Sequence, residues 1–141
     1  MNQAAIFFPV FALAGWTFAI LLLIPYKRIK AVALKQLVAD DFKLGESKNV
    51  PPSVSLPNQN YINLLELPVL FYVVCLVLYV TKNVDALVIY LAWTYVGFRL
   101  IHSVVHLTSN HIFQRFFVFA ISAFILIAMW VKAFVAILPT A

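Results

Sequence analysis

Gly97-Phe-Arg-Leu-Ile-His-Ser-Val-Val-His106 is a polar stretch in a chain whose other long segments are apolar. It carries Arg99, His102 and His106 at spacings of three and four residues, which put these side chains on one face of a helix. An arginine inside a membrane span costs about 2.5–3.5 kcal/mol on insertion scales. This face therefore has to meet protein, water or a polar ligand, and we expect function to reside there.

The rest of the chain has the composition of an integral membrane protein. Of its 141 residues, 65% are hydrophobic and 11% are charged, whereas about a quarter of a soluble domain is charged. Apolar runs predict membrane spans at 4–26, 59–80, 86–107 and 112–138. Dense proline, glycine and acidic residues predict an irregular connection over 40–58. We predict an all-α bundle of four transmembrane helices, with residues 1–141 forming a single domain.

The basic residues are concentrated in one connection. Six of the ten lie between the first two apolar runs, namely Lys27, Arg28, Lys30, Lys35, Lys43 and Lys48. The positive-inside rule places this connection in the cytoplasm, facing anionic lipid headgroups, and places both termini on the other side. No basic stripe with interleaved aromatic residues is present, so we exclude nucleic acid as a partner. Lys132, near the far end of the last span, is expected to extend to the membrane surface.

The predicted second span begins with unusually polar turns. Asn60, Asn63 and Glu66 follow one another at intervals of three residues. Glu66 is roughly 8 Å inside the span at 1.5 Å per residue. A carboxylate at that depth needs a partner, and we expect Arg99 or Arg115 to provide it.

The predicted topology brings polar residues from three spans to one depth. Asn60 and Asn63 lie at the cytoplasmic start of the second span, His102 and His106 at the cytoplasmic end of the third, and Arg115 at the cytoplasmic start of the fourth. We therefore expect them to form one cluster on the side of the basic connection.

Three interpretations of this cluster are open from the residues alone. Arg99 and Arg115 could bind an anionic ligand, with asparagine amides adding contacts and the apolar spans holding a lipophilic second substrate. His102 and His106 could ligate a metal or haem, although no His-Glu-x-x-His or carboxylate-rich pattern accompanies them. The polar groups could also simply join helices and subunits.

Specific motifs add a family resemblance. Asn60-Tyr-Ile-Asn-Leu-Leu-Glu-Leu-Pro-Val-Leu-Phe71, Arg99-Leu-Ile-His-Ser103 and Arg115 resemble the MAPEG family, the membrane-associated proteins of eicosanoid and glutathione metabolism. Within the family, the resemblance is to the short bacterial members. The resemblance covers the whole chain in span number and topology, and it is most specific over 58–116. It implies a homotrimer of four-helix subunits that binds glutathione between neighbouring subunits at the cytoplasmic end.

The resemblance also implies an activity. Arg115 resembles the arginine that stabilises glutathione as its thiolate, while Arg99 would lie near glutathione and His102 would pack within the bundle. The implied function is a glutathione-dependent transferase or peroxidase that acts on lipophilic electrophiles or hydroperoxides, with glutathione as co-substrate and no metal. The alternative is a non-catalytic protein of the same fold. The short chain and the absence of a recognisable retention tail favour the bacterial inner membrane, with periplasmic termini.

Further binding residues follow from the same resemblance. Asn60 and Asn63 fall where the family contacts the tripeptide, and Glu66 could contribute from the next turn. We also expect His106 to line the substrate site and Arg28 to reach the carboxylates of glutathione.

Overall fold

The computed structural model describes residues 2–43 and 45–138, and every regular element within these ranges is helical. The elements are η1 (Gln3–Ile6), α1 (Phe7–Ala33), η2 (Ala39–Phe42), α2 (Pro52–Val80), α3 (Ala86–Leu107) and α4 (Ile112–Ile137). Four helices are long and apolar enough to cross a membrane. The prediction of an all-α bundle with four membrane spans is therefore confirmed.

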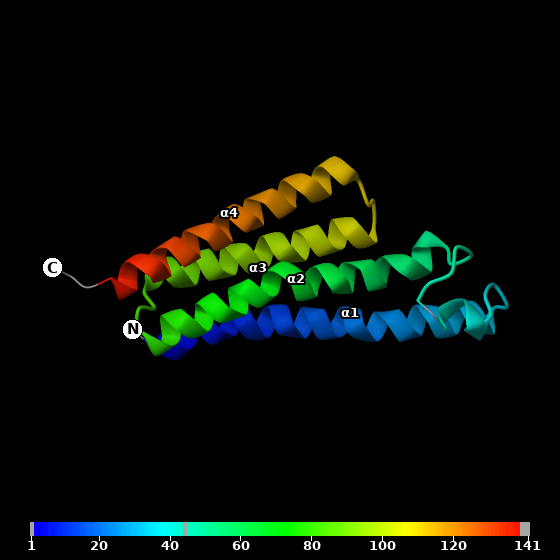
Figure 1. The fold of residues 1–141 in the computed structure, drawn as a ribbon, viewed down its shortest axis with the longest axis horizontal. Coiled ribbons are helices and arrows are strands. Elements are labelled where there is room, and N and C mark those ends of the chain that lie inside the picture. Colours follow the sequence, from blue (N-terminus) through cyan, green and yellow to red (C-terminus); the bar gives the residue numbers. More distant parts are fainter. Residues whose placement is uncertain (1, 44, 139–141) are drawn as a thin grey trace.

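The four long helices run side by side in an up-and-down arrangement (Figure 1). α1 packs mainly on α2, and α3 packs mainly on α4, so the bundle consists of two helical hairpins. Both described ends of the chain lie at one end of the bundle, while the α1–α2 and α3–α4 connections lie at the other (Figure 1). The basic connection and the α3–α4 turn therefore share one side, as predicted.

The helix boundaries differ from the predicted spans at the basic end. α1 continues past residue 26 to Ala33, and α2 begins at Pro52, inside the predicted 40–58 connection. Pro52 occupies the first turn of α2, where a backbone N–H has no helical partner and proline is favoured. Pro57 removes one further helical bond near the same end. As a result, α1 and α2 extend beyond α3 and α4 (Figure 1).

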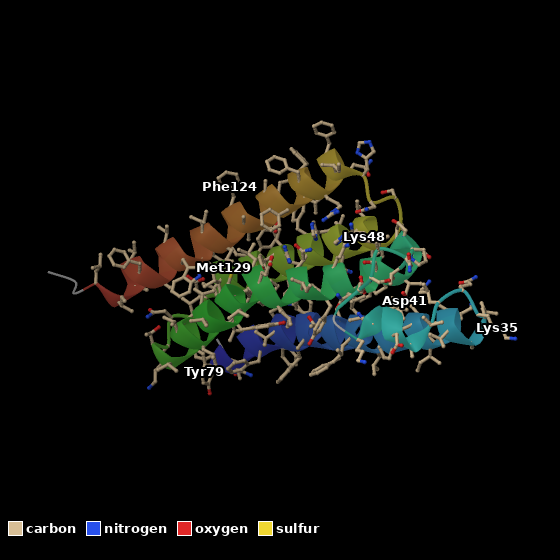
Figure 2. All side chains as sticks on the ribbon, turned by 45° about the vertical axis from the view of Figure 1, so that its right-hand side comes forward. Lys35, Asp41, Lys48, Tyr79, Phe124 and Met129 are labelled. Carbon is tan, nitrogen blue, oxygen red and sulfur yellow. The ribbon has the colours of Figure 1, made fainter. Side chains whose placement is uncertain are left out.

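Side-chain burial separates an apolar interior from an apolar outer surface. Phe71 of α2 stacks on Tyr95 of α3, with ring centres 4.6 Å apart and an interplanar angle of 22°, and both residues are fully buried. Figure 2 shows Met129 pointing into the bundle and Phe124 pointing away from it. Many other large apolar side chains are also exposed on the outer surface, which fits contact with lipid.

A buried hydrogen-bond network joins three of the helices. The Ser103 hydroxyl of α3 accepts one bond from the Trp16 indole of α1, at 2.8 Å, and another from the Asn60 amide of α2, at 2.6 Å. Helices in lipid have little hydrophobic drive to associate, so packing and interhelical hydrogen bonds stabilise their arrangement. This network therefore helps to hold the end of the bundle that contains the polar cluster.

The opposite end is held by polar contacts around the α2–α3 turn. The Gln3 side chain both donates to and accepts from the Val84 backbone, at 3.1 and 3.0 Å. Asp85 caps α3 by accepting a bond from the Val88 amide at 2.9 Å. Its other carboxylate oxygen lies 2.6 Å from the Lys132 ammonium of α4. These contacts tie the chain start and α4 to one turn.

Replacing Asp85 with asparagine is expected to remove a small acid-sensitive part of the stability. The hydrogen bond from Lys132 lowers the pKa of the Asp85 carboxyl below its ordinary value. A lowered folded-state pKa adds stability that is complete above the unfolded-state pKa of about 3.9 and is lost as the pH falls through the folded-state value. The Asp85 side chain is 52% exposed, so the contribution should be below about 1 kcal/mol.

Thermal unfolding in detergent between pH 3 and 7 measures this effect. Asparagine retains the helix cap, so the variant isolates the ion pair. A wild-type curve that falls no more steeply than that of Asp85→Asn below about pH 4 would contradict the prediction.

Candidate functional site

Side chains from three helices meet around one cavity in the half of the bundle near the basic connection. The cavity has a volume of about 270 Å³ and is lined by Asn63 of α2, His102 of α3, and Ile112, Arg115, Phe116 and Phe119 of α4. The sequence prediction that polar groups of the last three spans converge at this depth is confirmed for Asn63, His102 and Arg115.

Arg99 lies beside this cavity, within the bundle. Its side chain is fully buried, and its Nη2 atom donates to the Asn63 carbonyl oxygen at 2.6 Å. The guanidinium carbon is 5.7 Å from the ring centre of Phe119, one of the cavity-lining residues. Among the described residues, nothing accepts a hydrogen bond from Arg99 Nε or Nη1. The two unpaired nitrogens of this buried arginine can donate hydrogen bonds to acceptor atoms of a ligand.

Arg115 reaches the cavity from the first turn of α4. Its Nη1 atom donates to the Asn110 side-chain oxygen at 2.6 Å, which fixes the guanidinium against the α3–α4 turn. Asn110 adopts a left-handed conformation, with φ of 48°, that asparagine tolerates better than most residues. Arg115 Nε is buried and has no hydrogen-bond partner within the described chain. This nitrogen can therefore donate a hydrogen bond to a ligand while Nη1 stays bonded to Asn110.

The two histidines of α3 lie close together. The ring centres of His102 and His106 are 6.0 Å apart, and the ring of His102 is also 6.0 Å from that of Phe119. Both ring nitrogens of His106 are buried without a partner among the described residues. Within residues 2–43 and 45–138, no group of three or more His, Cys, Asp or Glu residues is placed to hold a metal ion. One chain thus offers two imidazoles, of which His102 borders the cavity.

The two asparagines of α2 occupy different environments. Asn63 borders the cavity, although its side-chain amide donates to the Gln59 carbonyl at 2.9 Å. Asn60 is fully buried and bonded to Ser103, and it is not among the cavity-lining residues. The predicted ligand contact of Asn60 stays a prediction, and the packing gives this residue a structural role within the bundle.

Glu66 is not paired as expected. The ion pairs found among the described residues are Arg28–Glu46 and Asp85–Lys132, so neither Arg99 nor Arg115 bridges to Glu66 within one chain. The expected pairing is therefore wrong for a single chain. Glu66 is instead exposed on the outer side of α2, because the rotation of α2 that buries Asn60 turns Glu66 outward.

Arg28 is engaged elsewhere in the structure. Its Nη2 atom lies 2.9 Å from the Glu46 carboxylate, and its guanidinium carbon is 4.9 Å from the Phe42 ring centre. Glu46 also accepts a hydrogen bond from Ser55. A ligand carboxylate could contact Arg28 only by competing with Glu46, so the predicted role of Arg28 in binding stays a prediction.

Four contributors to the site were not among the predicted site residues, namely Ile112, Phe116, Phe119 and Asn110. Phe119 forms part of the cavity wall and lies beneath the Arg99 guanidinium, and Asn110 orients Arg115. Phe119 follows Arg115 by four residues, a helical spacing that would have placed both on one face of α4. Asn110 lies in a short turn just before α4, where a side chain can readily reach the first helical turn.

The assembled site is electropositive and has partly apolar walls. Buried donors without partners cost about 1–3 kcal/mol each, and Arg99 and Arg115 together contribute three such nitrogens. Forked guanidinium groups match carboxylates and other anions, whereas Phe116 and Phe119 provide apolar contact. The geometry therefore suits an amphipathic anion more than an uncharged polar molecule.

The fold and the site define a polytopic membrane protein with a basic binding cavity near one end of its helix bundle. The family model described as the MAPEG family matches residues 6–135, nearly the whole chain. The chain belongs to the MAPEG family, whose members are membrane proteins associated with glutathione and eicosanoid metabolism. No curated protein and no solved structure matched the sequence.

Proposed function

We propose that this protein is a glutathione-dependent membrane transferase or peroxidase that acts on lipophilic electrophiles or hydroperoxides. The observation that carries the proposal is a cavity lined by Arg115 with the buried Arg99 beside it, three nitrogens of the two arginines lacking partners among the described residues. Glutathione supplies two carboxylates and several carbonyl oxygens as acceptors. The exposed Phe116 side chain gives a lipophilic substrate an apolar approach from the membrane.

The proposed chemistry depends on stabilising a thiolate. A hundred- to thousandfold larger thiolate fraction requires about 3–4 kcal/mol, at 1.36 kcal/mol per pKa unit. The Arg115 guanidinium can supply this in a partly desolvated site, because opposite charges attract more strongly away from water. The thiol proton leaves to water, and the thiolate is the nucleophile for the reaction that follows.

Two reaction types are open to this thiolate. With an electrophilic carbon, a new C–S bond forms and the leaving group departs with the bonding electrons. With a hydroperoxide, sulfur attacks the terminal oxygen, the O–O bond breaks and the alkoxide takes up a proton. The resulting sulfenic acid of glutathione reacts with a second glutathione to give the disulfide and water.

We further propose that the site is completed between copies of the chain in a homotrimer. The cavity of about 270 Å³ is smaller than the about 300–1,000 Å³ typical of ligand pockets, so one chain supplies only part of the surroundings of the tripeptide. Exposed Glu66 would be costly against lipid and would gain a partner from a neighbouring copy. In our proposal the trimer resides in the bacterial inner membrane, with its termini in the periplasm and the cavity toward the cytoplasm.

Replacing Arg115 with alanine is expected to lower the rate of glutathione conjugation about a hundredfold, because the removed guanidinium stabilises developing charge on sulfur. Arg115→Lys retains a positive charge and should retain part of the rate. The assay measures loss of glutathione with a lipophilic chloronitrobenzene or with a lipid hydroperoxide. Lys43→Ala removes an exposed loop charge and serves as the matched control.

The alternative function is a non-catalytic membrane protein in which the polar cluster joins helices. That alternative is favoured if Arg115→Ala alters the oligomer in size-exclusion chromatography. Wild-type protein without activity toward either substrate class would overturn the enzymatic proposal.

A further inference from the structure

A second cavity lies at the other end of the bundle, far from the arginine site. It has a volume of about 640 Å³ and lies between the α2–α3 turn and the last turns of α4, where the bundle carries its described chain ends (Figure 1). The turn contributes Lys82, Asn83, Val84 and Asp85 to its lining. Tyr79 marks this same end in Figure 2. The proposed glutathione chemistry does not use this cavity.

The α4 side of the cavity is a continuous helical face. It is formed by Ala128, Val131, Lys132, Val135 and Ala136. These residues are spaced at i, i+3, i+4, i+7 and i+8, the pattern of one helix stripe. Their side chains are small apart from Lys132, so the stripe is a shallow apolar groove. It differs from the stripe that α4 buries against the bundle, which includes Met129 and Ala133.

Polarity changes in a defined order along this groove. Lys82 and Asp85 lie on the turn, while Ala128 lies four residues deeper in α4 than Lys132, or about 6 Å along the helix axis. On α4, Ala128 and Val131 lie on the interior side of Lys132, whereas Val135 and Ala136 lie beyond it toward the helix end. The charged groups of the cavity therefore lie near the membrane surface, and the part of the lining that reaches toward the membrane interior is apolar. This is the order of head and tail in a lipid molecule.

The charges favour an anionic head. Lys82 and Lys132 supply two positive charges, and Asp85 supplies one negative charge, so the group carries a net charge of +1. The Lys132 ammonium is bonded to Asp85 at 2.6 Å, whereas Lys82 forms no ion pair among the described residues. A phosphodiester carries one negative charge, which matches this balance and attracts lysines near a membrane surface.

The turn that carries Lys82 is already ordered. Lys82 has a left-handed backbone, with φ of 57°, and its amide donates to the Tyr79 carbonyl at 3.1 Å. The Asn83 amide donates to the Leu78 carbonyl at 2.9 Å, and Gln3 holds Val84 from the other side. Binding a headgroup here would thus require little ordering of the backbone.

We propose that this cavity binds one anionic phospholipid, with its phosphodiester between Lys82 and Lys132 and an acyl chain that enters the membrane over Val131 and Ala128 of α4. The lipid belongs to the leaflet that contacts the chain ends. It would fasten α4 to the α2–α3 turn, since it contacts both elements. The proposal is independent of the proposed glutathione chemistry.

Native mass spectrometry of the whole protein with phosphatidylglycerol and phosphatidylcholine of identical acyl chains tests this binding. The wild-type protein should retain one phosphatidylglycerol more tightly than phosphatidylcholine. Lys82→Gln should weaken phosphatidylglycerol binding about fivefold, which corresponds to one lysine at a membrane surface. Ala128→Phe should block the groove and reduce binding of both lipids without changing any charge.

The matched control is Lys48→Gln, which removes an exposed lysine at the opposite end of the molecule (Figure 2). It should leave binding of the tightly held phosphatidylglycerol unchanged. Equal retention of the two lipids by the wild-type protein would overturn the proposal. It would also be overturned if Lys48→Gln weakened binding as much as Lys82→Gln, or if Ala128→Phe had no effect in a protein with normal size-exclusion behaviour. Glycerol phosphate, a headgroup without chains, should not compete at equal concentration, and full competition by it would contradict the role of the groove.

Discussion

Replacing Arg99 with methionine is expected to weaken glutathione binding at least about thirtyfold without lowering the stability of the protein. Truncating one partner of a buried, hydrogen-bonded charge pair costs about 2–5 kcal/mol of binding energy. In our proposal the partner is a carboxylate of glutathione, which would meet Arg99 Nε and Nη1. Isothermal titration of glutathione into each protein in detergent measures the change.

The unchanged stability follows from the burial of Arg99. A fully buried charge pays a desolvation penalty, and replacement by an apolar side chain of similar volume is often neutral or stabilising. The lost bond to the Asn63 carbonyl offsets part of this gain. We therefore expect the melting temperature of Arg99→Met to equal or exceed that of the wild-type protein. Retained affinity, or a protein that no longer folds, would show that Arg99 serves the bundle and not a ligand.

Replacing Phe71 with alanine is expected to destabilise the protein by about 2–3 kcal/mol. Phe71 is fully buried and stacks on Tyr95, so alanine would leave a cavity between α2 and α3. This loss of stability should lie at or below the low end of the range for phenylalanine-to-alanine changes in soluble proteins. The reason is that lipid also solvates the phenylalanine side chain when the helices separate. Thermal unfolding followed by circular dichroism in a mild detergent measures the loss.

Phe124→Ala is the matched control for this change. Phe124 is 71% exposed and points away from the bundle (Figure 2), so its removal should alter stability by less than about 0.5 kcal/mol. If Phe124→Ala destabilised the protein as much as Phe71→Ala, the outer face of α4 would have to be a packed interface. If Phe71→Ala had no effect, the described contact between α2 and α3 would be wrong.

Features that depend on neighbouring residues were predictable from the sequence. The four spans follow from apolar runs, and the shared side of the first and third connections follows from the alternating direction of successive spans. The approach of Asn63, His102 and Arg115 follows from topology alone, since alternating helix directions put these residues at one depth. The family motifs lie within the same segments.

Features that depend on helix rotation and on distant partners could not be predicted in this way. α2 is apolar around most of its circumference, so periodicity did not reveal that Asn60 points inward and Glu66 outward. Asn60 bonds to Ser103, 43 residues away, and Ser103 in turn accepts from Trp16, 87 residues away. Pro52 and Pro57 are compatible both with a loop and with the first turns of a helix. This ambiguity explains why the sequence prediction placed the start of α2 too late.

The most direct test of the central claim is an ultraviolet difference titration of glutathione into the purified protein, following thiolate absorbance. We expect a saturable thiolate signal in the wild-type protein, its loss in Arg115→Ala, and a normal signal in Lys43→Ala. All three proteins should elute as the same oligomer. Absence of a thiolate signal at millimolar glutathione, or an undiminished signal in Arg115→Ala, would contradict the claim that Arg115 stabilises a glutathione thiolate in this cavity.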